Sequence, residues 1–183
     1  LSGDELAAIV PPEARRFARD LDLPVQLHTG HMAGIRNRVD KTNAAYLASV
    51  LELHKEVRFD LFHGNWPYLG DLLFLGKNYP NVALDLCWLH IIDPDYASEL
   101  MERTVLTLPH TKVHGFGGDY GDVPEYVAGH LQIARENIAG TLARLVEIGT
   151  GDIPVQPVVG VIADLHGLIE IVVGQHAQHR AED

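Results

Sequence analysis

The sequence predicts an α/β fold in which parallel strands alternate with helices. Short apolar segments alternate with longer segments whose apolar residues recur at helical spacing. The short segments are apolar almost throughout, which is typical of parallel strands that helices cover. This alternation occurs four times within the 183 residues of the chain. Consecutive strands that are separated by a helix normally run parallel and are joined by right-handed crossovers.

The predicted elements follow one another without long gaps. Leu47 and Leu51 lie on the apolar stripe of one helix. Pro67 and Pro124 open two others, because proline is favoured in the first helical turn, and Gly149 ends the last. The predicted strands cover residues 23–28, 57–63, 82–88 and 112–117. The predicted helices cover residues 12–22, 43–56, 67–77, 94–107 and 124–148.

We expect these elements to form one structural unit over residues 1–150. Residues 151–183 are predicted to form a terminal helix, near residues 162–173, and a tail. Two architectures fit the alternation, a doubly wound sheet and a part of an eight-stranded barrel. Periodicity does not separate them, and the order of the strands in the sheet would decide.

Composition excludes several classes of function. The net charge of −11 and the lack of a basic stripe argue against nucleic-acid binding. No apolar run approaches the ~18 residues that a membrane span needs. The single cysteine, Cys87, excludes an internal disulfide framework and favours a reducing, cytoplasmic location. The first residues lack a signal-peptide pattern and an initiator methionine, so we expect a processed chain or a fragment. The expected partner is a small-molecule substrate.

Polar residues of one chemical kind lie at or just after the ends of three of the predicted strands. His28 ends the first strand, His63 ends the second, and Asp119 comes two residues after the fourth. Because the carboxyl ends of parallel strands meet at one edge of a sheet, these side chains are expected to face a common crevice. Imidazole nitrogen together with carboxylate oxygen suits zinc, manganese or iron. The sequence therefore predicts a site for a divalent metal, most simply zinc, at this edge.

Three further residues are candidates for contacts with a substrate. Trp66 follows His63 and either lines a pocket or packs a helix. Arg36 lies in the loop after His28 and either holds a substrate carboxylate or remains solvated. His90 follows the third strand and is a candidate pocket residue, whereas Cys87 is expected to be a small buried apolar side chain.

Four segments around these residues resemble motifs of the amidohydrolase-related family. They are Pro-Val-Gln-Leu-His-Thr-Gly at 24–30, Phe-His-Gly-Asn-Trp-Pro-Tyr at 62–68, Tyr-Pro-Asn-Val-Ala-Leu-Asp at 79–85 and Phe-Gly-Gly-Asp-Tyr at 116–120. They resemble the fifth to eighth strands of that family, in order, and residues 134–137 resemble its last long helix. The resemblance spans about residues 12–149 and is greatest to the uronate-isomerase-like and nodulin-like branch.

The resemblance implies a partial (β/α)8 barrel with a divalent metal, of which residues 1–150 form the C-terminal half. It implies that His28 and His63 are metal ligands or lie beside the metal. It implies that Asp119 both binds the metal and accepts a proton from the attacking water. The implied activity is hydrolysis of a C–N or C–O bond, and decarboxylation or sugar-acid isomerisation on the same fold are alternatives.

The sequence departs from the family at the first strand. The family carries a His-x-His pair there, and this sequence contains no His-x-His. A half-barrel also leaves two sheet edges without partners, which favours aggregation or pairing. Three alternatives remain: the natural protein is longer, the chain pairs with another chain as in a homo-oligomer, or it is a non-catalytic fragment or degenerate paralogue.

Overall fold

A four-stranded parallel sheet forms the centre of the computed structural model, which describes residues 10–35, 37–121 and 123–148. The strands are β1 (Val25–Leu27), β2 (Phe59–Leu61), β3 (Val82–Asp85) and β4 (Val113–His114). They lie in the order β1-β2-β3-β4, and every neighbouring pair is parallel. The predicted α/β class and all four predicted strands are confirmed. The predicted helix and tail within residues 151–183 lie outside the described residues.

The strand order decides between the two architectures. A doubly wound sheet reverses its order at a switch point, whereas the strands of a barrel follow the chain around the sheet. Here each strand pairs with the next one in the sequence, with Val25 opposite Phe59, Phe59 opposite Val82 and Leu84 opposite Val113. The sheet therefore has the order of consecutive strands in a (β/α)8 barrel.

The predicted helices 94–107 and 124–148 keep their bounds, whereas 12–22 ends at Asp20 and 67–77 begins at Leu69, two residues after Pro67. The largest difference lies near residues 43–56. There a 3-10 turn over Ala44–Leu47 precedes a short helix, and the side chain of Asn43 caps this turn by accepting from the Ala45 amide at 3.0 Å. Within the described residues no helix is long and apolar enough to span a membrane. The helices are α2 (Pro12–Asp20), α3 (Ala48–Leu53), α4 (Leu69–Asn78), α5 (Leu89–Ile92), α6 (Pro94–Thr107) and α7 (Pro124–Ile148).

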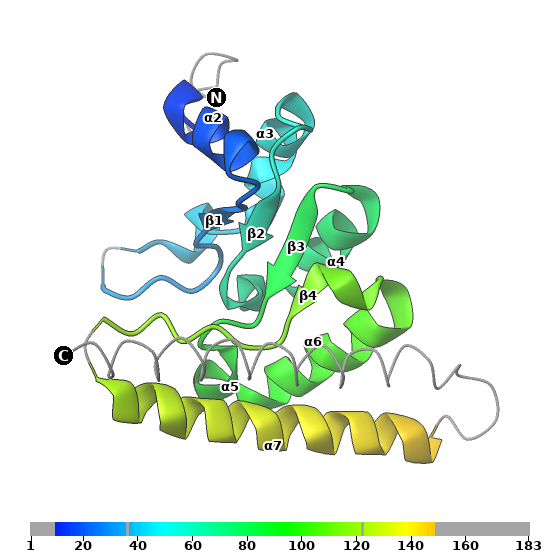
Figure 1. Cartoon of the computed structure of the whole chain (residues 1–183). Coiled ribbons are helices and arrows are strands. Elements are labelled where there is room, and N and C mark those ends of the chain that lie inside the picture. The colour runs from blue at the N-terminus through cyan, green and yellow to red at the C-terminus, as the bar shows by residue number, and fades with distance from the viewer. Residues whose placement is uncertain (1–9, 36, 122, 149–183) are drawn as a thin grey trace.

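The long helix α7 runs beside α5 and α6, and these two lie between α7 and the sheet (Figure 1). Short α5 was not predicted. It begins after Trp88, which has a φ of 59° and stands at the end of the predicted strand 82–88. Asp93 separates α5 from α6 and caps the latter by accepting a hydrogen bond from the Tyr96 amide at 3.0 Å.

The two faces of the sheet differ in chemistry. Phe59, Leu61 and Leu84 are fully buried within the apolar core of the molecule. Successive side chains on a strand point to opposite faces, so the residues between them, such as Asp60 and Asp85, lie on the other face. In a barrel this second face lines the interior. Beyond the last residues of the strands, further polar side chains lie at the carboxyl edge of the sheet.

Candidate metal centre

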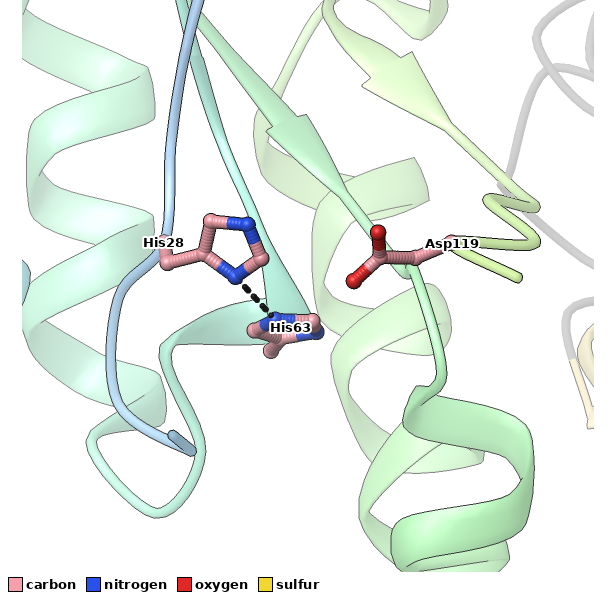
Figure 2. Close-up of side chains that lie close together, drawn as sticks. All are labelled: His28, His63 and Asp119. Carbon is pink, nitrogen blue, oxygen red and sulfur yellow. Dashed lines mark hydrogen bonds between the residues drawn. The ribbon is translucent and has the colours of Figure 1, made fainter. Parts of the chain in front are cut away.

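His28 and His63 lie side by side at the carboxyl edge of the sheet, and Asp119 approaches them from the segment after β4 (Figure 2). One ligand atom from each of the three side chains lies within 4.8 Å of the other two. Nδ1 of His28 is 2.8 Å from Nε2 of His63. The structure thus brings together the three residues that the sequence predicted as metal ligands.

A tight left-handed turn at the end of β2 presents His63. His63, Gly64 and Asn65 all have positive φ, at 62°, 55° and 51°. Such backbone is uncommon for residues other than glycine and concentrates at functional sites. Asn65 is fully buried and holds the turn, because its side chain accepts from the Ala44 amide at 2.8 Å and donates to the Tyr68 carbonyl at 3.0 Å.

The backbone of Cys87 determines which nitrogen of His63 is free. The carbonyl oxygen of Cys87 lies 2.9 Å from Nδ1 of His63 and can only accept, so Nδ1 carries the hydrogen. Nε2 then keeps its lone pair and faces His28. His63 is buried, and this burial is the main reason that its pKa lies below the usual value. The imidazole is therefore held neutral, as a metal ligand must be.

Asp119 is exposed and also has a positive φ, of 46°. Its segment is fixed to the loop after β3 by two hydrogen bonds from Trp88. The Trp88 amide donates to the Gly117 carbonyl at 3.3 Å, and the indole donates to the Gly118 carbonyl at 2.6 Å. The loop after β3 thereby contacts both His63 and the segment that carries Asp119.

The three side chains fit a divalent metal ion. They combine two imidazoles with one carboxylate, a donor set that suits zinc, manganese and iron. Because Nδ1 of His63 carries its hydrogen, Nε2 of His63 accepts a hydrogen bond from Nδ1 of His28 at 2.8 Å. His28 and Asp119 are exposed, so the remaining coordination positions of such an ion would be open to water or substrate.

Aromatic side chains surround His63. The His31 ring lies 6.1 Å from the rings of both His63 and Trp66, and the Trp88 ring lies 6.0 Å from that of His63. Trp66 is half-buried, and its indole donates to the Asp93 carboxylate at 3.0 Å. Trp66 thus packs beside His31, which lies beside His63, and its contact with a substrate stays a prediction. The sequence analysis missed Trp88, because no motif marks a residue whose backbone turns left-handed after a strand.

Of the other two predicted substrate contacts, one is not described and one lies away from the centre. Arg36 lies outside the described residues. His90 is fully buried, and its Nε2 lies 2.9 Å from the Gly115 carbonyl, to which it donates. Its ring packs beside His130, at 6.4 Å between ring centroids. This location makes His90 part of the packing between α5 and α7 and gives it no surface for a substrate.

A second polar cluster lies on the barrel-interior face of the sheet. Asp60 in β2, Asp85 in β3 and His114 in β4 bring ligand atoms within 4.8 Å of one another. Nδ1 of His114 is 3.2 Å from Asp60 and 3.8 Å from Asp85. The pKa of His114 is raised, mainly by its hydrogen bond to Asp60. Burial, and then Asp60, raise the pKa of Asp85 to about 7. The sequence analysis did not select these residues, because each stands inside or at the end of an apolar strand.

The fold and the groups at its edge define the class: an α/β chain with barrel strand order and candidate metal ligands after three strands. The sequence profile of the amidohydrolase family matches residues 9–128. Because this match covers more than half of the chain, the chain belongs to the amidohydrolase family. The resemblance inferred from the motifs is thus confirmed for the family, and its branch stays a prediction.

Two individual proteins are similar to the chain. Protein fluG of Emericella nidulans is 33% identical over 91 residues, which are 49% of this chain and 10% of fluG. A crystal structure from Lactobacillus casei ATCC 334, described as a metal-dependent hydrolase, has 21% sequence identity and a TM-score of 0.60. That match covers 70% of this chain and 34% of the other, and it supports the fold. The chain thus spans about a tenth of fluG and a third of the Lactobacillus protein.

Proposed function

We propose that this chain supplies the strand-five to strand-eight side of a metal-dependent hydrolase centre. In this proposal His28, His63 and Asp119 bind one divalent ion, with zinc preferred and manganese or iron as alternatives. The observation that carries it is the convergence of three ligand atoms within 4.8 Å at the carboxyl edge of the sheet. Active sites of barrels lie at this edge.

Each residue has a separate role in the proposed reaction, hydrolysis of a C–N or C–O bond in a small-molecule substrate. When bound, a divalent ion supplies the Lewis acid that lowers the pKa of water towards ~7. His63 holds its position through the Cys87 carbonyl and presents Nε2. The exposed carboxylate of Asp119 accepts the proton of the attacking water and returns it to the leaving group. Trp66 and His31 flank the place where a substrate would lie.

Metal binding tests this proposal directly. The purified chain is expected to bind one equivalent of zinc, measured by elemental analysis and by competition with a chromophoric chelator. Asp119→Asn keeps the shape of the side chain and removes its charge, so it should weaken binding. Asp95→Asn, in the first turn of α6, is a matched control that should leave binding unchanged. A chain that binds no zinc, or binds it equally well as Asp119→Asn, contradicts the proposal.

Turnover is expected to need more than the 183 residues. The family places a His-x-His pair on its first strand, and this sequence contains none. Catalysis also depends on preorganised groups in a shaped pocket, whereas His28 and Asp119 are exposed here. We therefore expect no substantial hydrolysis across a panel of amides, lactones and sugar acids. Adding an N-terminal half with a His-x-His strand should give turnover that Asp119→Asn abolishes, and strong turnover by the chain alone contradicts this expectation.

A further inference from the structure

The loop after β3 links the two polar clusters. Asp85 is the last residue of β3 and is buried, and its Oδ1 accepts a hydrogen bond from the Cys87 amide at 2.6 Å. A bond from an Asp side chain to the backbone two residues later builds a local turn. The carbonyl of the same Cys87 accepts from Nδ1 of His63 at 2.9 Å. An uninterrupted path of two short hydrogen bonds thus joins the Asp85 carboxylate to the His63 imidazole.

Close packing leaves this loop little freedom. A methyl group on Gly117 would lie 2.7 Å from Cβ of Cys87 and 3.0 Å from Oδ1 of Asp85, so the backbone after β4 passes directly over the turn. The Leu86 amide also donates to the His114 carbonyl at 2.9 Å. On its other side Asp85 faces His114, which lies between the two aspartates. Oδ1 of Asp85 thus accepts from the Cys87 amide, and Oδ2 lies 3.8 Å from Nδ1 of His114.

We propose that Asp85 is a positioning residue for His63 and acts through the backbone of Cys87. By fixing the Cys87 turn, it aims the Cys87 carbonyl at Nδ1 of His63. This contact selects the tautomer that leaves Nε2 free and sets the orientation of the ring. Partners that orient ligand histidines affect metal affinity although they never touch the metal. In this respect the inference rests on the proposed function, in which His63 is a ligand.

The hydrogen-bonding capacity of Asp85 is what this role requires, and its charge is not. Asn in place of Asp still offers an oxygen to the Cys87 amide, whereas Leu has the same branched shape and offers none. Asp60 belongs to the same buried cluster and has no hydrogen bond to Cys87 in the described structure, so Asp60→Asn is a matched control. The three variants separate a positioning bond from a general effect of altering the cluster.

The test measures the tautomer of His63 in the metal-free protein by long-range ¹H–¹⁵N NMR, and zinc affinity by chelator competition. Wild type, Asp85→Asn and Asp60→Asn are expected to show the Nδ1–H tautomer and similar affinities. Asp85→Leu should show a mixture of tautomers and bind zinc about 10- to 100-fold more weakly. Circular dichroism and thermal unfolding report whether each variant is folded.

Three outcomes overturn the inference. The first is an Nε2–H tautomer of His63 in the metal-free wild type, a measurement that needs no variant to fold. The second is an Asp85→Leu chain, or Asp85→Ala if the leucine variant is unfolded, with wild-type tautomer and affinity. The third is a second zinc ion that survives in His63→Ala and is lost in Asp85→Asn, since Asp85 would then be a ligand itself. If the wild type binds no zinc, the proposed function fails, and the tautomer measurement still decides the positioning role.

Discussion

Two clusters of three polar side chains lie close together in this sheet, and they differ in where they stand on the strands. His28, His63 and Asp119 follow the strands, and two of them are exposed. Asp60, Asp85 and His114 stand within the strands or at their last residue, and both aspartates are buried. The same residue types thus occur in both clusters. Their position along the strand determines whether a ligand can reach them.

Hydrogen bonding separates the two clusters further. In the buried cluster Nδ1 of His114 lies 3.2 Å from Asp60 and 3.8 Å from Asp85, so this nitrogen faces carboxyl groups of its own cluster. At the edge, the protein backbone contacts only Nδ1 of His63, and Nε2 is left for His28 or for a metal. Three residues of the edge region, His63, Asn65 and Asp119, also have positive φ. Left-handed backbone thus coincides at the edge with a histidine nitrogen, Nε2 of His63, that no backbone group occupies, as expected for a binding site.

The largest expected effect is on metal affinity. His63→Ala removes a ligand, so zinc binding should fall by more than the about 10- to 100-fold that the loss of an outer hydrogen bond causes. His114→Gln removes one histidine from the buried cluster in the same way. It should leave the number of bound zinc ions and their affinity unchanged. Chelator competition on both variants compares the clusters directly. Equal losses in the two variants would remove the functional distinction between them.

The next largest effect concerns the close contact between the segment after β1 and the segment after β2. Gly30 has a φ of 65°, and a methyl group there would overlap the backbone of Asn65 and Trp66. Gly30→Ala is therefore expected to lower the free energy of unfolding by at least about 3 kcal/mol, since backbone has to move. Gly70→Ala, in α4 with no atom within 4 Å of the new methyl group, should stabilise by up to about 1 kcal/mol. Urea unfolding measures both, and a well-tolerated Gly30→Ala contradicts the close approach.

The sequence predicted the fold well because its signals are local. Apolar runs mark the four strands, and Pro124 marks the start of α7, whereas α4 begins two residues after Pro67. His28, His63 and Asp119 were predicted from their places after strands, and the structure brings them together. The register-dependent features were harder, since no local pattern shows which strand residues face the barrel interior. The second cluster becomes recognisable only when the register of three strands is known, because that register brings together Asp60, Asp85 and His114.

His90 and Cys87 also show what the sequence could not predict. For His90 it is the burial of the side chain, and for Cys87 it is a contact of the backbone. His90 follows a strand, as His28 and His63 do, but the left-handed turn at Trp88 redirects the chain and buries it. Cys87 was predicted as a small buried side chain, and it is fully buried. Its carbonyl, however, contacts His63, and backbone groups carry no sequence signal. Roles that depend on backbone direction therefore require the structure.

A third prediction uses pH to examine the buried cluster. The pKa of Asp85 is raised from 3.8 to about 7, chiefly by burial and by Asp60. Between these two values the folded chain binds more protons than the unfolded chain, so this contribution to stability is lost as the pH rises. Asp85→Asn removes it. Relative to wild type, the variant should therefore gain stability between about pH 4 and about pH 7.

Other groups make the comparison with wild type necessary. The pKa of His130 is lowered to about 4, mainly by burial, so its contribution to stability rises with pH over part of the same window. That slope is common to both chains and cancels in the difference. Urea unfolding at several pH values measures the difference. If it is independent of pH, the carboxyl of Asp85 does not titrate as proposed.

The smallest expected effect concerns the turn that presents His63. The hydroxyl of Tyr96 in α6 donates to the Gly64 carbonyl at 3.0 Å, so Tyr96→Phe leaves that carbonyl without its partner and should cost about 1 kcal/mol. Tyr79→Phe removes an exposed hydrogen bond to Glu52, in the segment that precedes β3, and should cost less. Because Asn65 still holds the turn by its own side-chain bonds, zinc affinity in Tyr96→Phe should fall by only a few fold. A loss as large as that of His63→Ala would mean that α6, and not Asn65, controls the geometry of the turn.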